Sequence, residues 1–118
     1  MTDLSARAVT AALELCSALA AARPLAPIRI ATTLGTFAAP QNPVGAARVT
    51  LHVDTLGVIV LAEIKGATRP LCQYSIPFPY VDGAPDVERI ESPAFGSFVG
   101  ANLQAALLVA REQTGAAA

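Results

Sequence analysis

The only histidine in this 118-residue chain is His52, so any serine–histidine or cysteine–histidine catalytic site would have to use it. Asp54 lies two residues after His52, so the two side chains would point to the same side of a strand. A turn after that strand already explains an aspartate at this position. The stretch "GSFVG", from Gly96 to Gly100, has its serine in second place, whereas a nucleophile elbow needs it third. The sequence therefore predicts no catalytic residues. An enzyme that uses His52 is the third hypothesis for the function, after an assembly protein and a ligand-binding or effector-binding module.

Metal-binding and cofactor-binding patterns are not found in the sequence either. No paired spacing links Cys16, Cys72 and His52. The acids around Gly83 do not follow the spacing of an EF-hand calcium loop, and no glycine-rich phosphate loop or dinucleotide fingerprint occurs. We expect no metal, no cofactor and no evident small-molecule ligand. Two cysteines so far apart also argue against a disulfide scaffold and favour a reducing compartment.

Composition points to association with another protein. Hydrophobic residues make up 53% of the chain and charged residues only 14%, whereas about a quarter of an average soluble domain is charged. A small protein with so few charges leaves apolar surface that another copy, or a protein partner, can cover. We therefore expect a homo-oligomer or a protein–protein complex.

The charge and the termini exclude other partners and locations. A net charge of −1 lacks the basic face that nucleic-acid binding needs. Asp3 and Glu14 interrupt the apolar N-terminal run that would otherwise resemble a signal peptide. No stretch approaches ~20 uninterrupted apolar residues, the length of a transmembrane helix. The sequence predicts a protein of the cytoplasm, or of a particle assembled there, that binds no nucleic acid and no membrane.

Periodicity and turn residues divide the chain into helix, strands and helix. Ser92 before Pro93 is a strong helix start, and prolines after residue 23 end the first helix. The stretch "DTLG", from Asp54 to Gly57, is typical of a hairpin turn. The expected elements are a helix over 2–23, strands over 28–38, 47–53, 58–65 and 71–76, and a helix from 92 to about 114.

These elements predict a single α+β domain over residues 1–118. Its antiparallel sheet has three to four strands in a meander, the element order is α-β-β-β-β-α, and both helices pack on one face of the sheet. The alternation in "ARVTLHV" places Leu51 on the buried face and His52 on the exposed face. We also expect Ile59 in the core.

Residues 75–93, "SIPFPYVDGAPDVERIESP", gather four prolines and four of the nine acids. One interpretation is a crossover from sheet to helix in which Phe78 plugs the end of the sheet. The other is a stiff contact ridge whose acids meet arginines of a neighbouring copy, because the chain carries a charge of +2 up to Pro70 and −3 after it. A solvated acidic loop that keeps the protein soluble is the plain alternative. The candidate interface residues are Phe78, Tyr80, Asp82, Asp86, Glu88, Glu91, Arg23, Arg48 and Arg69.

The element order is similar to that of small tail-completion and neck proteins of long-tailed phages, and to that of small secretion chaperones. This resemblance implies a non-enzymatic, self-associating assembly protein, such as a small structural subunit of a phage virion. The alternative is a small-ligand or effector-binding module of the chaperone kind. Because one fold can serve many functions, element order alone does not decide between them.

Overall fold

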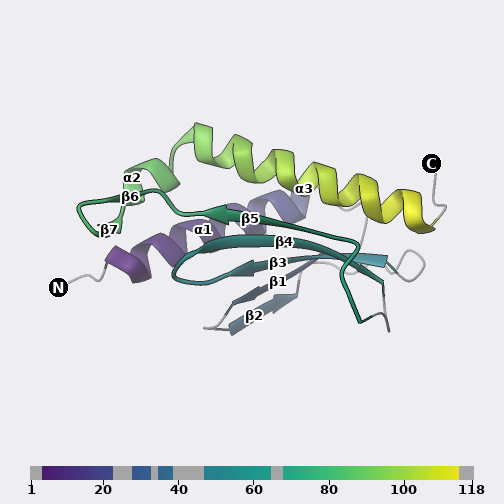
Figure 1. Cartoon of the computed structure of the whole chain (residues 1–118). Coiled ribbons are helices and arrows are strands. Elements are labelled where there is room, and N and C mark those ends of the chain that lie inside the picture. Colours follow the sequence, from purple (N-terminus) through teal and green to yellow (C-terminus); the bar gives the residue numbers. More distant parts are fainter. Residues whose placement is uncertain (1–3, 23–27, 33–34, 39–46, 65–67, 115–118) are drawn as a thin grey trace.

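The computed structural model describes residues 4–22, 28–32, 35–38, 47–64 and 68–114. Two long helices lie on one face of a five-stranded sheet (Figure 1). The helices are α1 (Leu4–Ala22), the single-turn α2 (Val87–Ile90) and α3 (Pro93–Thr114). The strands are β1 (Ile28–Thr32), β2 (Gly35–Ala38), β3 (Ala47–Val53), β4 (Gly57–Ile64), β5 (Cys72–Pro77), β6 (Tyr80–Val81) and β7 (Ala84–Pro85).

The sheet has the order β2-β1-β3-β4-β5 and is mixed. The expected α+β class, with a helix at each end of the chain, is confirmed, but the purely antiparallel meander is wrong. β1 and β2 form an antiparallel hairpin in which Thr32 pairs with Gly35, so the predicted single strand over 28–38 is two strands. This hairpin reverses the chain before β3 begins, and β3 therefore runs parallel to β1. The sheet consequently has five strands rather than three or four.

The core lies between the sheet and the two long helices. β3 and β4 pair antiparallel, and their alternate residues on the helix face are almost completely buried. α1 contacts β1 and β3, whereas α3 lies over β3, β4 and β5. The fully or nearly buried residues of this face are Val49, Leu51, Val53, Val58, Val60 and Ala62.

The opposite face of the sheet carries the remaining alternate residues of β3 and β4. His52 pairs with Ile59, and Arg48 pairs with Glu63. Ile59 is only half-buried, so its predicted place in the core is wrong. It is an odd-numbered residue of β4, and the register of the β3–β4 hairpin places it beside His52, away from the helices. Within the described residues, no helix covers this face (Figure 1).

Both long helices are strongly apolar. By length and composition alone, Leu4–Ala22 and Pro93–Glu112 could cross a membrane, although core helices of soluble proteins meet the same criterion. Only 28% and 33% of their residues, respectively, are buried within the chain. Much of their apolar surface is therefore not covered by the described residues.

The difference between the two faces gives a direct test of the register. Leu51→Ala should lower the free energy of unfolding by about 2–5 kcal/mol, because Leu51 is fully buried and its loss leaves a cavity. Ile59→Ala should cost clearly less, since part of its side chain is already in water. Urea denaturation of both variants measures this. Equal losses would contradict the assignment of the two faces.

Candidate functional site

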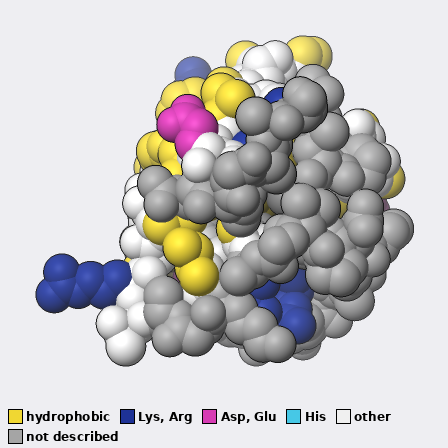
Figure 2. Space-filling view, turned by 90° about the vertical axis from the view of Figure 1, so that its right-hand side faces the viewer, with side chains coloured by type: hydrophobic (Ala, Val, Ile, Leu, Met, Phe, Trp, Pro, Cys, Tyr) yellow, Lys and Arg dark blue, Asp and Glu magenta, His cyan; other side chains and the backbone are white. Residues whose placement is uncertain are grey.

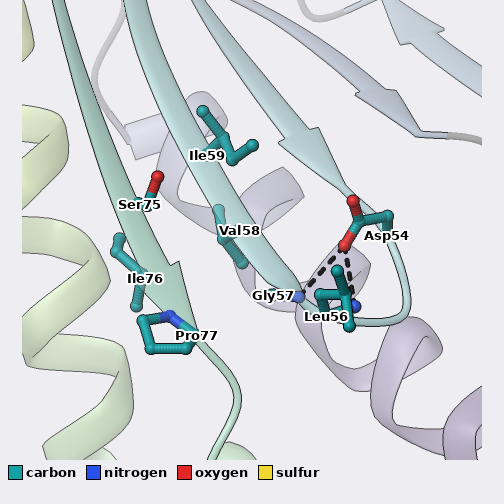
Figure 3. A pocket seen from close by; sticks show the side chains of 8 residues that line it. All are labelled: Asp54, Leu56, Gly57, Val58, Ile59, Ser75, Ile76 and Pro77. Atoms are coloured by element: carbon teal, nitrogen blue, oxygen red, sulfur yellow. Dashed lines mark hydrogen bonds between the residues drawn. The ribbon is translucent and has the colours of Figure 1, made fainter.

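The turn between β3 and β4 is organised by Asp54. Its Oδ1 accepts hydrogen bonds from the backbone N–H of Leu56 at 2.7 Å and of Gly57 at 3.1 Å (Figure 3). The backbone N–H of Asp54 donates to the carbonyl oxygen of Gly57 at 3.1 Å. The predicted role of Asp54 as a turn residue is confirmed.

Gly57 is required at this turn because β5 passes too close for any side chain. A Cβ built on Gly57 would lie 2.3 Å from the carbonyl oxygen of Ile76 and 2.8 Å from the Cα of Pro77. Both neighbours are backbone atoms, which cannot rotate away as a side chain can. The turn thus depends on close contact with the end of β5.

The proline-rich segment after β5 is anchored on the same turn. The backbone N–H of Phe78 donates to the carbonyl of Leu56 at 3.0 Å, and the Tyr80 hydroxyl donates to the carbonyl of Thr55 at 3.0 Å. Phe78 is only 4% exposed and its ring packs against that of Phe95, with centroids 6.1 Å apart. Phe78 therefore plugs the end of the sheet and has no surface to offer a partner. Tyr80, 48% exposed, remains available.

A largely apolar hollow of about 310 Å³ lies beside this turn (Figure 3). Its size is at the lower limit for small-molecule sites, about 300–1,000 Å³. Ser75 and Asp54, two of its polar residues, lie on opposite sides of the hollow in Figure 3. It could hold an apolar group, but it brings no nucleophile and base together. The hollow is lined by Asp54, Leu56, Gly57, Val58, Ile59, Ser75, Ile76 and Pro77.

The candidate acidic residues (Asp82, Asp86, Glu88 and Glu91, here called the acidic ridge) occupy a short hairpin and the turn of helix after it. Asp82 and Gly83 have φ of 52° and 78° and connect β6 to β7, which is typical of a type I′ hairpin turn. Asp86 caps α2 by accepting from the backbone N–H of Arg89 at 3.3 Å, and its Oδ2 lies 3.7 Å from the Arg89 Nε. Asp82, Glu88 and Glu91 are exposed.

Two of the candidate arginines, Arg48 and Arg69, lie at the other end of the molecule, where β3 begins and β4 ends (Figure 1). The Arg48 Nε lies 3.8 Å from the Glu63 Oε1, and the same oxygen accepts from the Thr50 hydroxyl at 2.9 Å. Arg69 is exposed, just before β5. Arg23 lies outside the described residues. Within one copy, therefore, the structure does not bring the acids and the described arginines together.

The side chains with possible catalytic chemistry are also separate from one another. His52 is half-buried on the open face of the sheet, whereas Cys16 is fully buried in α1. Burial raises the pKa of Cys16 to about 12, so its thiol stays protonated and inert. A hydrogen bond with the Cys72 side chain raises the pKa of the Tyr74 hydroxyl, as do, to a smaller extent, the Cys72 charge and burial. Among the described residues, no three His, Cys, Asp or Glu side chains cluster as metal ligands would.

Sequence reasoning missed two features of this region. The β6–β7 hairpin could have been found from its "DG" pair, which is a strong hairpin indicator. The hollow could not, because it depends on how β5 ends beside the β3–β4 turn.

Comparison with known proteins gives no relative. No family model matches the chain, and neither the curated proteins nor the solved structures that were searched contain a match.

Gly57→Ala should reduce the free energy of unfolding by at least about 2 kcal/mol, because the new methyl group cannot fit against the backbone of β5. Gly100→Ala is the matched control. A Cβ there would lie 3.8 Å from the Leu19 Cδ2, an ordinary contact, and alanine favours the helix by up to about 1 kcal/mol. Urea denaturation compares the two, and a Gly57→Ala protein as stable as Gly100→Ala would contradict the close contact.

His52→Gln should change the free energy of unfolding by less than about 1 kcal/mol, since His52 lies on the open face of the sheet. Glutamine keeps the polarity and fits a half-buried strand position. Should this variant stay folded yet lose a measured activity of the protein, the non-enzymatic hypothesis would be wrong.

Proposed function

We propose that this protein is a non-enzymatic assembly protein that associates with further copies of itself. The observation that carries the proposal is the outer surface of α3. Residues 93–110 contain no charged side chain, and Phe98 and Leu108 are 55% and 53% exposed there. Figure 2 views the molecule end-on, from the right-hand side of Figure 1; among the described residues of that end, apolar side chains lie beside a few charged ones.

Self-association would bury this surface at little electrostatic cost. Each Å² of apolar surface removed from water contributes about 25 cal/mol, and no charge on residues 93–110 has to be desolvated. A second copy presents the same uncharged surface, so no repulsion opposes the contact. This fits a small structural subunit of a larger particle in the cytoplasm, such as a phage virion, as the similarity in element order implies.

The acidic ridge and the arginines give the assembly a direction. The ridge and the start of β3 lie at opposite ends of the molecule (Figure 1), so the ridge of one copy can meet Arg48 and Arg69 of the next. Such a head-to-tail contact closes into a ring or grows into a stack. Asp86 is already used as the cap of α2, which leaves Asp82, Glu88 and Glu91 for this role. These exposed charges would govern orientation and encounter rate more than affinity.

The hollow beside the β3–β4 turn favours a second candidate, a module that binds a small apolar ligand. Such a ligand would raise the melting temperature according to its concentration and affinity. Self-association needs no ligand, so the two functions separate in purified protein.

Light scattering coupled to size exclusion tests the proposal. Purified protein without added ligand should have a mass that is a multiple of the 12.1 kDa chain and that rises with concentration. High salt should leave the apolar contacts intact but weaken the head-to-tail contacts, because exposed charges are screened. A monomer at every concentration and salt would refute the proposed function.

Charge reversal separates the two kinds of contact. Glu88→Lys combined with Glu91→Lys should stop growth beyond the smallest oligomer, while the fold is retained because both side chains are exposed. Glu88→Asp combined with Glu91→Asp keeps both negative charges, so it is the matched control and should leave the mass unchanged. If the double variant keeps the wild-type mass at low and high salt, the acidic ridge only solubilises the protein.

A further inference from the structure

β5 is the outermost strand of the five-stranded sheet. Within the described residues, no strand pairs with its outer edge. Proteins usually protect such an edge with charges, prolines or a bulge. From Leu71 to Val81 the sequence "LCQYSIPFPYV" has no charged residue, and its prolines begin only at the end of β5. The edge between Cys72 and Ile76 is therefore open to strand pairing.

In an antiparallel pair of strands, residues that bond to the neighbouring strand alternate with residues whose N–H and C=O groups point away from it. This alternation identifies the backbone groups that lie on the open edge of β5. The N–H of Phe78 donates to the carbonyl of Leu56, which makes these two residues a hydrogen-bonded pair. In the register of β4 and β5, every second residue back from Phe78 also bonds to β4, namely Ile76 and Tyr74. The alternation ends at the start of β5, where the N–H of Leu71 donates to the Ala62 carbonyl at 2.6 Å. The N–H and C=O groups of Gln73 and Ser75 must then point outward.

We propose that a second copy pairs its β5 antiparallel with this edge, centred on Tyr74, so that the two sheets become one. The inference rests on the proposed function and names the surface through which copies associate side by side. Gln73 of each copy then lies opposite Ser75 of the other, and all the outward N–H and C=O groups of both residues are paired. An antiparallel contact between identical strands has two-fold symmetry, so it forms a closed dimer.

Neighbouring registers leave polar groups unpaired. Centred on Ser75, the contact would place the Gln73 carbonyl opposite Pro77, which has no N–H. Centred on Gln73, it would place the Ser75 carbonyl opposite Leu71, whose N–H already donates to the Ala62 carbonyl at 2.6 Å. The register centred on Tyr74 pairs all the outward groups of Gln73 and Ser75 and leaves unmatched groups only at Leu71 and Pro77, at the two ends of the strand.

The side of α3 next to this edge is apolar as well. Gly96 and Gly100 face α1, because Cβ atoms there would lie 3.6 Å and 3.8 Å from Leu15 and Leu19. At about 100° per residue, Phe98, Ala105 and Val109 lie on the opposite side of α3. α1 covers β1 and β3, and α3 extends over β5, so this opposite side is the one nearer the open edge.

The β5 flank, defined as the open edge with Phe98, Ala105 and Val109, suits a second copy in size and in chemistry. It has no charge, so it neither selects a charged partner nor repels itself. The uncharged residues 93–110 of α3 span about 27 Å, and a helix with its strand layer is about 15 Å high, which gives a strip of about 400 Å² in projection. Because accessible area exceeds projected area, the contact lies at the lower end of specific interfaces, about 600 Å² per partner.

Cysteine cross-linking tests the register. Across the two-fold axis the two Tyr74 residues form a non-hydrogen-bonded pair with Cα atoms about 4.5 Å apart, which is within disulfide range. Tyr74→Cys in a Cys72→Ser background should therefore give a covalent dimer on mild oxidation. Cys16 does not interfere, because it is buried and its pKa is about 12.

Ser75→Cys in the same background is the matched control. Two Ser75 residues would be offset by two positions along the strands, beyond the reach of a disulfide, so it should stay monomeric on a denaturing gel. If Ser75→Cys cross-links instead, or neither variant does although the wild type is a dimer by light scattering, the β5 flank proposal is overturned and self-association uses another surface. A monomeric wild type overturns both proposals.

Ser75→Pro provides a test that needs no cross-link. The Ser75 N–H points outward, so proline leaves the ladder with β4 intact but removes a donor from the edge. At high salt, where the head-to-tail contacts are screened, we expect the variant to keep the circular dichroism spectrum of the wild type and to lose the dimer, halving the mass, whereas Ser75→Ala keeps both. A folded Ser75→Pro protein with the wild-type mass, or a dimer that persists in the folded variant Phe98→Glu, contradicts the proposal.

Discussion

The register of the β3–β4 hairpin is the constraint on which the rest of this structure depends. A slip by one residue would exchange the two faces and expose the six small aliphatic residues that now lie under the helices. Asp54 fixes the register by binding two backbone N–H groups of the turn, and Gly57 allows β5 to approach to contact distance. The turn therefore determines both which face is the core and where β5 lies.

The same turn also anchors the proline-rich segment that covers the end of the sheet. Phe78 and Tyr80 bond to consecutive carbonyls of the turn, so the proline-rich segment leaves β5 in a fixed direction. That direction places the Phe78 ring against Phe95 near the start of α3. Ser92 then accepts a hydrogen bond from the Phe95 N–H and caps the helix. The position of α3 thus follows from a chain of local contacts that begins at Asp54.

Those features that depend on local chemistry could be predicted from the sequence. Ser92 and Pro93 start α3, Asp54 makes the turn, and His52 lies on the face opposite Leu51. Features that depend on distant pairing could not. The parallel pairing of β1 with β3 follows from a hairpin within 28–38, where the apolar run gave only Gly35 as a possible break. The sequence predicts Ile59 in the core because β4 is apolar on both faces, and its composition does not reveal which of these faces lies under the helices.

The same distinction between local chemistry and distant pairing applies to the candidate site. The sequence located the prolines, aromatics and acids, but only the fold separates Phe78, which is buried, from Tyr80, which is exposed. Asp86 was predicted as a surface charge and is also the cap of α2. Neither the open edge of β5 nor the side of α3 beside it is visible in the sequence, because each exists only once strand order is known.

One-sided packing explains why a small protein would retain so much apolar surface. With both helices on one face, the outer sides of α1 and α3 contact no further layer among the described residues, and the sheet ends at β5 without a covering strand. A chain limited to 14% charged residues cannot make all of these surfaces polar. Four of its nine acids are instead gathered in the acidic ridge, and none lies in the β5 flank. Strand pairing along the flank and charge pairing between the ends use different surfaces, so both contacts can form in the same assembly.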